Sequence, residues 1–310
     1  MKPLVVVIVG PTASGKTALS IELAKKVNGE IISADSMQIY KDMNIGTAKP
    51  AKEEMQGIKH YLIDCVSPLE RYSVSEYKKA AILAIEEILE KGKVPIIVGG
   101  TGLYVDSLIY GIDFQEMEFD KLYREELEQL VSEGKLPELY EKAKFIDPEA
   151  IEKISPNDKK RILRILEIYK ATGKNKTEQN KESLKNGVPF NYVVFALDWE
   201  RDELYNRINK RVDLMLEQGL IEEVQNLLEK YGTEMPTAMQ GLGYKEVKQF
   251  FDRELTEDEM IEKIKQETRR YAKRQLTWFR KNKETIWLDA KSGLDENLKV
   301  IFEKGGFNGK

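Results

Sequence analysis

Residues 10–17 have the types and the spacing of a loop that binds phosphate. The segment Gly10-Pro11-Thr12-Ala13-Ser14-Gly15-Lys16-Thr17 fits the pattern G-x-x-x-x-G-K-[ST]. Glycines let such a loop curl so that successive N–H groups point at phosphate oxygens, and the lysine adds a positive charge. The hydroxyl of Thr17 can hold Mg²⁺. The loop predicts a ligand with at least two phosphates, and it does not say whether this ligand is a nucleotide.

Two further polar residues follow predicted strands and could act beside this loop. Asp35 ends a strand expected at 30–34, and Thr101 lies in a glycine-rich loop after a strand expected at 93–98. A carboxylate at this place can accept a proton or support Mg²⁺ through water, whereas a surface aspartate that caps a turn is the plainer alternative. Glycines and Thr101 stand where ATPases of the usual plan carry an aspartate, which argues against ATP hydrolysis. The amide of Gln38 could pair with the edge of an adenine.

Basic side chains gather on two predicted helices. Arg207 and Arg211 lie one turn apart on a helix expected at 201–218, and two guanidinium groups on one face suit a pyrophosphate. A solvated, salt-bridged face explains that spacing equally well. Residues 261–283 contain nine basic and two acidic residues, a local charge of +7 in a chain whose net charge is −4. Cations interleaved with aromatic residues at this density favour contact with a nucleic-acid backbone.

The elements that must position these residues alternate between strands and helices. Apolar runs predict strands at 4–9, 30–34, 60–64, 93–98, 191–197 and 285–289. Helical periodicity predicts helices at 18–24, 75–91, 201–218, 221–230 and 257–283. This order predicts an α/β fold with a doubly wound, mostly parallel sheet.

One part of the chain lacks strand patterns. Helices are expected at 123–133, 136–144 and 157–172, with Gly173 as a cap and a polar linker at 174–187. We therefore expect an α/β core of residues 1–113 and 188–310 that is interrupted by an all-helical insertion domain of residues 114–187.

The composition describes a soluble, globular protein. The chain has 310 residues, of which 33% are charged and 41% are hydrophobic. No apolar run approaches the roughly 18 residues that span a membrane. Cys65 is the only cysteine and His60 the only histidine of the sequence. This excludes internal disulfides and metal sites built from several cysteines or histidines. We expect a cytoplasmic protein.

Several motifs in a fixed order resemble those of tRNA dimethylallyltransferases of the bacterial type, also called tRNA isopentenyltransferases. Besides residues 10–17 they are Asp35-Ser36-Met37-Gln38-Ile39-Tyr40, Ile45-Gly46-Thr47-Ala48-Lys49-Pro50, Gly99-Gly100-Thr101-Gly102-Leu103-Tyr104, Asn157-Asp158 with Arg161, Gln240-Gly241-Leu242-Gly243-Tyr244, and Tyr271-Ala272-Lys273-Arg274-Gln275 with Thr277-Trp278. The motifs cover nearly the whole chain.

The resemblance implies a P-loop NTPase-like fold and a prenyl transfer. Such enzymes move a dimethylallyl group from dimethylallyl pyrophosphate to the exocyclic amine of the adenosine that is 3′-adjacent to the anticodon. Pyrophosphate leaves and Mg²⁺ assists. On this resemblance Asp35 is the general base and Thr101 positions the reacting groups. Arg207, with Arg211 second, neutralises the pyrophosphate that residues 10–17 hold.

The resemblance also implies contacts with the tRNA anticodon stem-loop. We expect the chain to be a monomer. The residues expected there are Asp35, Ser36, Met37, Gln38, Thr101, Tyr123, Lys159, Lys160, Arg161, Ile162, Leu163, Gln240, Gly241, Leu242, Gly243, Tyr244, Lys245, Lys273 and Arg274.

Two other functions fit parts of the sequence. A P-loop kinase of small molecules would use the insertion as a lid, and it would leave the basic residues at 261–283 without a role. A non-catalytic RNA-binding protein would use phosphate binding as a switch, and it would not need Asp35 for its activity.

Overall fold

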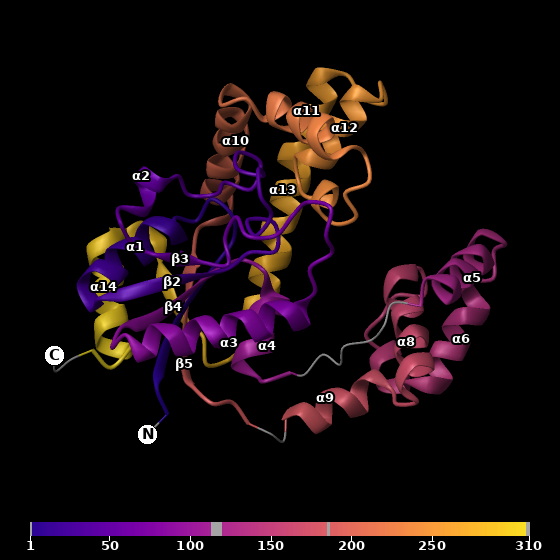
Figure 1. Cartoon of the computed structure of the whole chain (residues 1–310), viewed down its shortest axis with the longest axis horizontal. Coiled ribbons are helices and arrows are strands. Elements are labelled where there is room, and N and C mark those ends of the chain that lie inside the picture. The colour runs from indigo at the N-terminus through magenta and orange to yellow at the C-terminus, as the bar shows by residue number, and fades with distance from the viewer. Residues whose placement is uncertain (1, 113–119, 185–186, 308–310) are drawn as a thin grey trace. The chain divides into compact units, whose positions relative to one another are not determined.

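The computed structural model describes residues 2–112, 120–184 and 187–307 (Figure 1). The chain divides into two compact units, Met1–Ile109 with Pro189–Lys310, and Tyr110–Val188. The domain limit expected between residues 113 and 114 lies outside the described residues. Each unit has its own hydrophobic core and is considered by itself.

A parallel sheet forms the centre of the first unit. Its described strands are β1 (Leu4–Val9), β2 (Gly29–Ala34), β3 (His60–Tyr61), β4 (Val94–Gly99), β5 (Asn191–Asp198) and β6 (Ile286–Asp289). Their order across the sheet is β3-β2-β4-β1-β5-β6, and each neighbouring pair is parallel. The predicted fold class, a doubly wound parallel sheet of the P-loop NTPase-like type, is confirmed.

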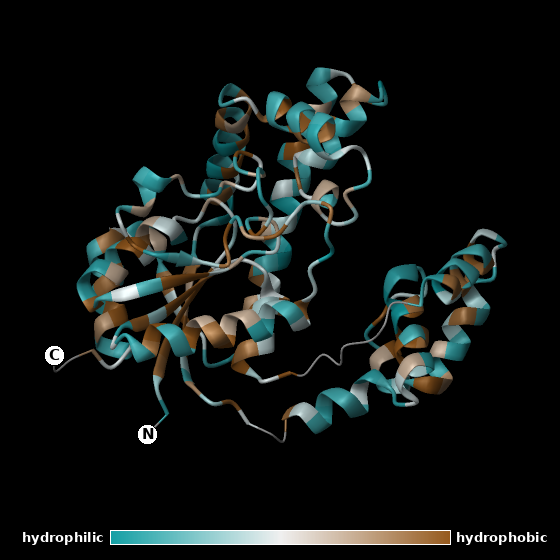
Figure 2. Ribbon diagram, viewed as in Figure 1, coloured by the Kyte–Doolittle hydropathy of each residue, from teal (hydrophilic) through white to brown (hydrophobic). Residues whose placement is uncertain are grey.

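The side chains of β1 are divided between the two faces of this sheet. Val5, Val7 and Val9 pack against α3 (Val74–Glu90) and α4 (Gly102–Ile109). Val6 and Ile8 pack on the other side, against α1 (Lys16–Val27) and α14 (Gly293–Lys304). Figure 2 shows the hydrophobic strands between these helices. A strand buried on both faces needs apolar residues throughout, which explains the unbroken run in the sequence.

A second core lies beside the sheet in the same unit. The helices α10 (Arg201–Glu217), α11 (Leu220–Tyr231), α12 (Tyr244–Phe251) and α13 (Glu257–Phe279) contribute most of its side chains. Ile39, Tyr40 and Met43, which follow β2, are buried in this core. The segment after β2 is thus packed against helices that come much later in the chain.

The second unit is built from helices wherever the structure describes it. They are α5 (Lys121–Ser132), α6 (Leu136–Ile146), α7 (Pro148–Ile151), α8 (Lys159–Thr172) and α9 (Lys176–Leu184). Leu127, Leu139, Ile162 and Leu166 form the centre of its core. Gly173 ends α8 in the left-handed conformation that glycine adopts without strain.

Several boundaries differ from the prediction. The strand expected at 60–64 ends at Tyr61, because Leu62 and Asp64 have positive φ angles of 57° and 55°. The helix expected at 257–283 ends at Phe279. The sequence predicted no helix for several elements that the structure shows, namely α2 (Lys52–Met55), α4, α7, α12, α14 and the 3₁₀ helices η1 (Ala238–Gln240) and η2 (Ala290–Ser292).

The prediction of a polar linker at 174–187 was wrong, because α9 occupies most of this segment. Asp147 is only 1% exposed, and its carboxylate accepts hydrogen bonds from the backbone N–H of Thr177 at 2.9 Å and from its hydroxyl at 2.7 Å. Asn175 caps the same turn by accepting from the N–H of Glu178. A contact with a distant residue therefore stabilises a helix whose own composition does not predict it.

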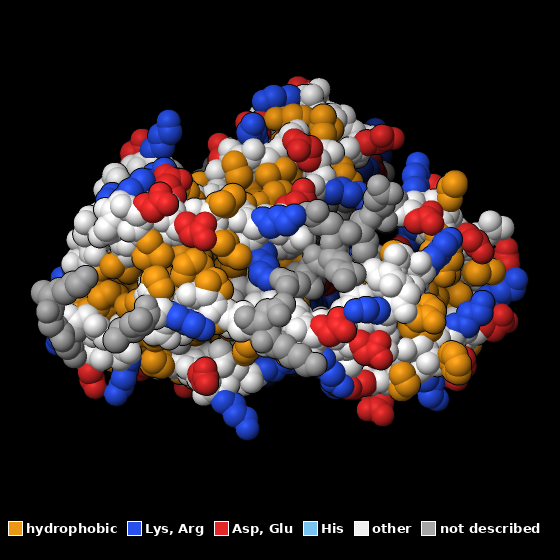
Figure 3. Space-filling model, turned by 60° about the horizontal axis from the view of Figure 1, so that its bottom comes forward, with side chains coloured by type: hydrophobic (Ala, Val, Ile, Leu, Met, Phe, Trp, Pro, Cys, Tyr) orange, Lys and Arg blue, Asp and Glu red, His pale blue; other side chains and the backbone are white. Residues whose placement is uncertain are grey.

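No helix among the described residues is long and apolar enough to cross a membrane. On the face shown in Figure 3, basic, acidic and hydrophobic side chains are interspersed.

The contact between Asp147 and α9 can be tested directly. Replacing Asp147 by alanine removes three hydrogen bonds, to Thr177 and to the N–H of Ala150. We expect α9 to open more easily by about 2 kcal/mol, so that its amides exchange roughly thirtyfold faster with solvent deuterium. The exposed neighbour Glu152 provides the control Glu152→Ala. Equal exchange in the two variants would contradict this role of Asp147.

Candidate active site

The phosphate loop joins β1 to α1. Gly10 and Gly15 have φ angles of 152° and 94°, and Ala13 has a φ angle of 61°. These conformations turn the chain sharply before α1 begins at Lys16. The first turn of α1 contains no acidic side chain, so the positive end of its dipole is available to an anion.

Side chains from α10 and from the residues before it hold this loop in shape. The indole N–H of Trp199 donates to the carbonyl of Ser14 at 3.0 Å, and Nε of Arg207 donates to the carbonyl of Ala13 at 2.9 Å. The guanidinium group of Arg207 also lies 4.3 Å from the centre of the Trp199 ring. Arg211 is exposed one turn further along α10. The structure therefore places Arg207 at the loop and Arg211 in solvent.

Lys16 lies close to Asp35. Its ammonium group donates to the carbonyl of Pro11 at 2.6 Å, so the side chain folds back over the loop. Burial lowers the pKa of Lys16 to about 8, and the negative charge of Asp35 opposes this shift. Lys16 is therefore mostly protonated at neutral pH and offers a poorly hydrated positive charge to a phosphate oxygen.

Asp35 and Thr101 are brought together by the pairing of β2 with β4. Ala34 lies opposite Gly99 in the register of these strands. The carboxylate of Asp35 accepts from the backbone N–H groups of Met37 at 2.8 Å and Gln38 at 3.2 Å. The hydroxyl of Thr101 accepts from the N–H of Ser36 at 3.0 Å. Both side chains thus belong to one hydrogen-bonded turn at the carboxyl edge of the sheet.

Helix α13 joins the two loops through Gln275, a residue of the motif at 271–275 to which the sequence assigned no role. Gln275 is 5% exposed, and its amide oxygen accepts from the N–H of Thr12 at 3.0 Å. Its amide nitrogen donates to the carbonyl of Gly100 at 2.9 Å. A Cβ atom on Gly100 would lie 2.1 Å from this nitrogen, which explains the glycine. These residues are far apart in the chain, so no local sequence pattern could predict their contact.

Tyr271 and Trp278 also approach the site from α13. The hydroxyl of Tyr271 interacts with the side chains of Thr101 and Gln275, and burial raises its pKa, with a further contribution from the charge of Asp35. The indole N–H of Trp278 donates to the carboxylate of Asp106 at 2.9 Å. A tyrosine that stays neutral can keep its hydroxyl proton for a hydrogen bond within the site.

Some residues expected to contact tRNA lie beside this site. A Cβ atom on Gly241 would lie 3.0 Å from the sulfur of Met37, so the turn at 240–245 packs on the segment after β2. Gln240 and Lys245 are exposed, and Leu242 is half-buried. On α13, Lys273 and Arg274 are exposed.

Two interpretations in this region need correction. The amide nitrogen of Gln38 donates to the carbonyls of Thr47 at 3.1 Å and Ala48 at 3.2 Å, so it is not free to pair with a base. The side chain of Tyr244 is completely buried and cannot reach an RNA.

The other residues expected to contact tRNA lie in the helical unit. Lys159, Lys160 and Arg161 are exposed in the first turn of α8, which Asp158 caps. Tyr123 lies under the ammonium group of Lys170, 3.8 Å from the centre of its ring.

Ile162 and Leu163 do not fit the expected contact. Both side chains are 0% exposed in the core of the helical unit, so they cannot touch tRNA. Helical periodicity explains the error, because the exposed basic turn continues directly into the buried face of α8.

The parallel sheet and the loop between β1 and α1 define a protein of the P-loop class. A family model described as IPP transferase matches residues 38–282. A protein of Acetivibrio thermocellus named tRNA dimethylallyltransferase is 52% identical over 297 residues, which are 96% of this chain and 95% of that protein. A protein of Caldanaerobacter subterraneus with the same name is 48% identical, over 96% of both chains.

Solved structures that resemble this chain carry similar names. A tRNA delta(2)-isopentenylpyrophosphate transferase from Staphylococcus epidermidis is 43% identical with a TM-score of 0.73, over 99% of this chain and 100% of that chain. A eukaryotic dimethylallyltransferase acting on tRNA is 34% identical with a TM-score of 0.83, over 98% of this chain and 79% of that chain. The chain therefore belongs to the tRNA dimethylallyltransferase, or IPP transferase, family. The resemblance seen in its motifs is confirmed.

The contact between Asp106 and Trp278 predicts a pH dependence. Burial raises the pKa of Asp106 to about 6, whereas the hydrogen bond from Trp278 opposes this shift. Because the folded state favours the protonated carboxyl group, the unfolding free energy of the wild type should fall relative to Asp106→Asn as pH rises from about 4 to 7. Solvent screening of this half-buried group limits the change to about 1 kcal/mol. Urea unfolding at several pH values measures the difference, and a constant difference would contradict it.

Proposed function

We propose that this chain transfers the dimethylallyl group of dimethylallyl pyrophosphate to the exocyclic amine of the adenosine 3′-adjacent to a tRNA anticodon. Its membership of the family supports this reaction, since the relatives are named for it. The observation that carries the proposal is the placement of Asp35 and Thr101 beside the phosphate loop. A proton acceptor and a group that binds the leaving pyrophosphate are what this alkyl transfer needs.

The loop at 10–17 holds the pyrophosphate as a leaving group. Its backbone N–H groups and the N-terminus of α1 attract the anion. Lys16 and Arg207 add positive charge at the loop, since Lys16 donates to the carbonyl of Pro11 and Arg207 donates to the carbonyl of Ala13. These groups stabilise the charge that builds on the departing oxygen.

Mg²⁺ fits this site as a partner of the pyrophosphate. Thr17 is exposed at the start of α1, where its hydroxyl can join phosphate oxygens and water as a ligand. The described residues contain no group of three or more histidine, cysteine, aspartate or glutamate side chains that could hold a metal ion alone. The ion would neutralise charge on the leaving group.

Asp35 serves as the general base. An aryl amine is a poor nucleophile, so the bond between carbon and the leaving oxygen breaks ahead of attack and the allylic carbon gains positive charge. The amine nitrogen then bonds to this carbon, and Asp35 takes the proton that the nitrogen gives up. The adenine must leave its stack to reach the carboxylate. Thr101, which is bonded to the same turn, positions the reacting groups.

Exposed residues supply the surface for the anticodon stem-loop. In the first unit we assign this role to Gln240, Lys245, Lys273 and Arg274, which are exposed, and to Met37. In the helical unit the residues are Tyr123 and the basic turn of Lys159, Lys160 and Arg161. One chain supplies the groups of the proposed reaction, so we expect a monomer, and we place it in the cytoplasm with its tRNA.

An assay with labelled dimethylallyl pyrophosphate and unmodified tRNA tests this function. We expect the dimethylallyl label to enter the tRNA while pyrophosphate is released. A small-molecule kinase would instead consume ATP and leave the tRNA without label.

The general base is tested by Asp35→Asn. This variant keeps an oxygen that can accept from the N–H groups of Met37 and Gln38, so the turn should persist. We expect the rate of transfer to fall by about 10²- to 10⁴-fold while tRNA binding is unchanged, because only the proton acceptor is lost. Asp289→Asn is the matched control, since Asp289 is an aspartate at the end of strand β6 whose carboxylate likewise accepts from a backbone N–H two residues on. A parallel loss of tRNA affinity would contradict the assignment.

The salt dependence of tRNA binding tests the basic face of α13. If Lys273 and Arg274 contact backbone phosphates, replacing both with alanine should weaken binding. The slope of log affinity against log salt concentration should also become shallower by about 2. The double variant Lys299→Ala/Lys304→Ala on α14 should leave the slope unchanged. Filter binding over a range of salt concentrations measures both, and equal slopes would assign Lys273 and Arg274 to a solvated face.

A further inference from the structure

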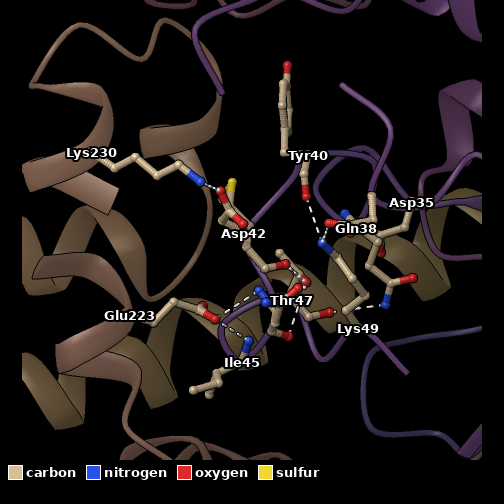
Figure 4. A network of polar contacts seen from close by, with 12 residues as sticks. Asp35, Gln38, Tyr40, Asp42, Ile45, Thr47, Lys49, Glu223 and Lys230 are labelled. Atoms are coloured by element: carbon tan, nitrogen blue, oxygen red, sulfur yellow. Dashed lines mark hydrogen bonds and ion pairs between the residues drawn. The ribbon is translucent and has the colours of Figure 1, made fainter. Parts of the chain in front are cut away.

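A carboxylate of α11 lies at the centre of a hydrogen-bond cluster away from the phosphate loop (Figure 4). Oε2 of Glu223 accepts from the backbone N–H groups of Asn44 at 2.9 Å and Ile45 at 2.8 Å. Its Oε1 accepts from the N–H of Gly46 at 3.1 Å and from the hydroxyl of Tyr244 at 2.6 Å. One half-buried side chain thus satisfies three consecutive N–H groups of a loop that is distant in the sequence.

The loop fits closely against Tyr244. A Cβ atom on Gly46 would lie 2.5 Å from the ring of Tyr244, so only glycine allows the approach. Burial, together with the negative charge of Glu223, raises the pKa of the Tyr244 hydroxyl far above its ordinary value. The hydroxyl therefore remains a donor to Glu223 at physiological pH.

The same loop holds the turn that carries Asp35. The carbonyls of Thr47 and Ala48 accept from the amide of Gln38, at 3.1 Å and 3.2 Å. The backbone N–H of Gln38 in turn donates to the carboxylate of Asp35 at 3.2 Å. Lys49 ties the end of the loop to the carbonyl of Tyr40 at 2.7 Å. Gln38 therefore links the loop to the proposed general base, because its side chain bonds to the loop and its backbone N–H bonds to Asp35 (Figure 4).

We propose that Glu223 is a positioning residue for Asp35 and acts through the loop of residues 44–49. This inference rests on the proposed prenyl transfer. Within the described part of the chain, Glu223 forms hydrogen bonds with the loop and with Tyr244, and none with residues 10–17. Loss of its charge should therefore impair the steps that involve the adenosine and its proton. Binding of dimethylallyl pyrophosphate should be unaffected.

Three variants separate positioning from simple stability. Glu223→Gln keeps the size of the side chain but turns an acceptor into a donor that faces N–H or O–H groups. Tyr244→Phe keeps the ring against Gly46 and removes the hydroxyl that donates to Glu223. Glu222→Gln changes the exposed neighbour on the same turn of α11 and is the matched control.

The kinetic constants for both substrates, with the melting temperature of each variant, test the inference. We expect Glu223→Gln to lower kcat about tenfold to a hundredfold while the KM for dimethylallyl pyrophosphate stays unchanged, since small displacements of a catalytic group have effects of this size. Tyr244→Phe should cause a smaller loss, and Glu222→Gln none. Added to Asp35→Asn, Glu223→Gln should cause little further loss, because both act on the same group.

Two results would overturn the inference. One is a Glu223→Gln variant that melts earlier but has the kcat of the wild type, which would make the cluster purely structural. The other is a full, additive loss in the Asp35→Asn background, which would show that Glu223 acts elsewhere. If the wild type and Glu222→Gln both fail to label tRNA, the proposed function itself has failed.

Discussion

The site depends on the close approach of β2 and β4 in parallel register. A Cβ atom on Gly99 would lie 2.2 Å from the backbone carbonyl of Ala34, so only glycine permits this spacing. Because β4 also pairs with β1, the carboxyl ends of these strands meet at one edge of the sheet. The phosphate loop, Asp35 and Thr101 come directly after these ends. Their proximity is therefore a property of the sheet and needs no bound ligand.

Helices from the second half of the chain then fix the loops at that edge. Gln275 forms hydrogen bonds with the phosphate loop and with the loop after β4. Arg207, on α10, forms a hydrogen bond with the phosphate loop. Glu223 holds a further loop that leads back to Asp35. Such contacts order the catalytic groups before substrates arrive, which lowers the entropic cost of reaching the transition state.

Much of this arrangement could be predicted from local sequence patterns. The buried strands, the phosphate loop and the amphipathic helices have periodic signatures, and the motifs pointed to the family. The bonds of Gln275 and Glu223 could not be predicted, because they join residues that are far apart in the chain. Ile162 was misassigned since a motif marks a segment and not the direction of each side chain. Helix α9 was missed because Asp147, outside that segment, stabilises it.

The central claim is that the phosphate loop holds a group that departs from carbon, and that no phosphoryl group is transferred. Dimethylallyl pyrophosphate with a heavy oxygen isotope in the bridge between carbon and phosphorus tests this claim most directly. Incubation with unmodified tRNA, followed by mass spectrometry of the products, locates the isotope. The account predicts that all of it appears in the released pyrophosphate. Heavy oxygen retained on the dimethylallyl product would show cleavage between oxygen and phosphorus and would contradict the account.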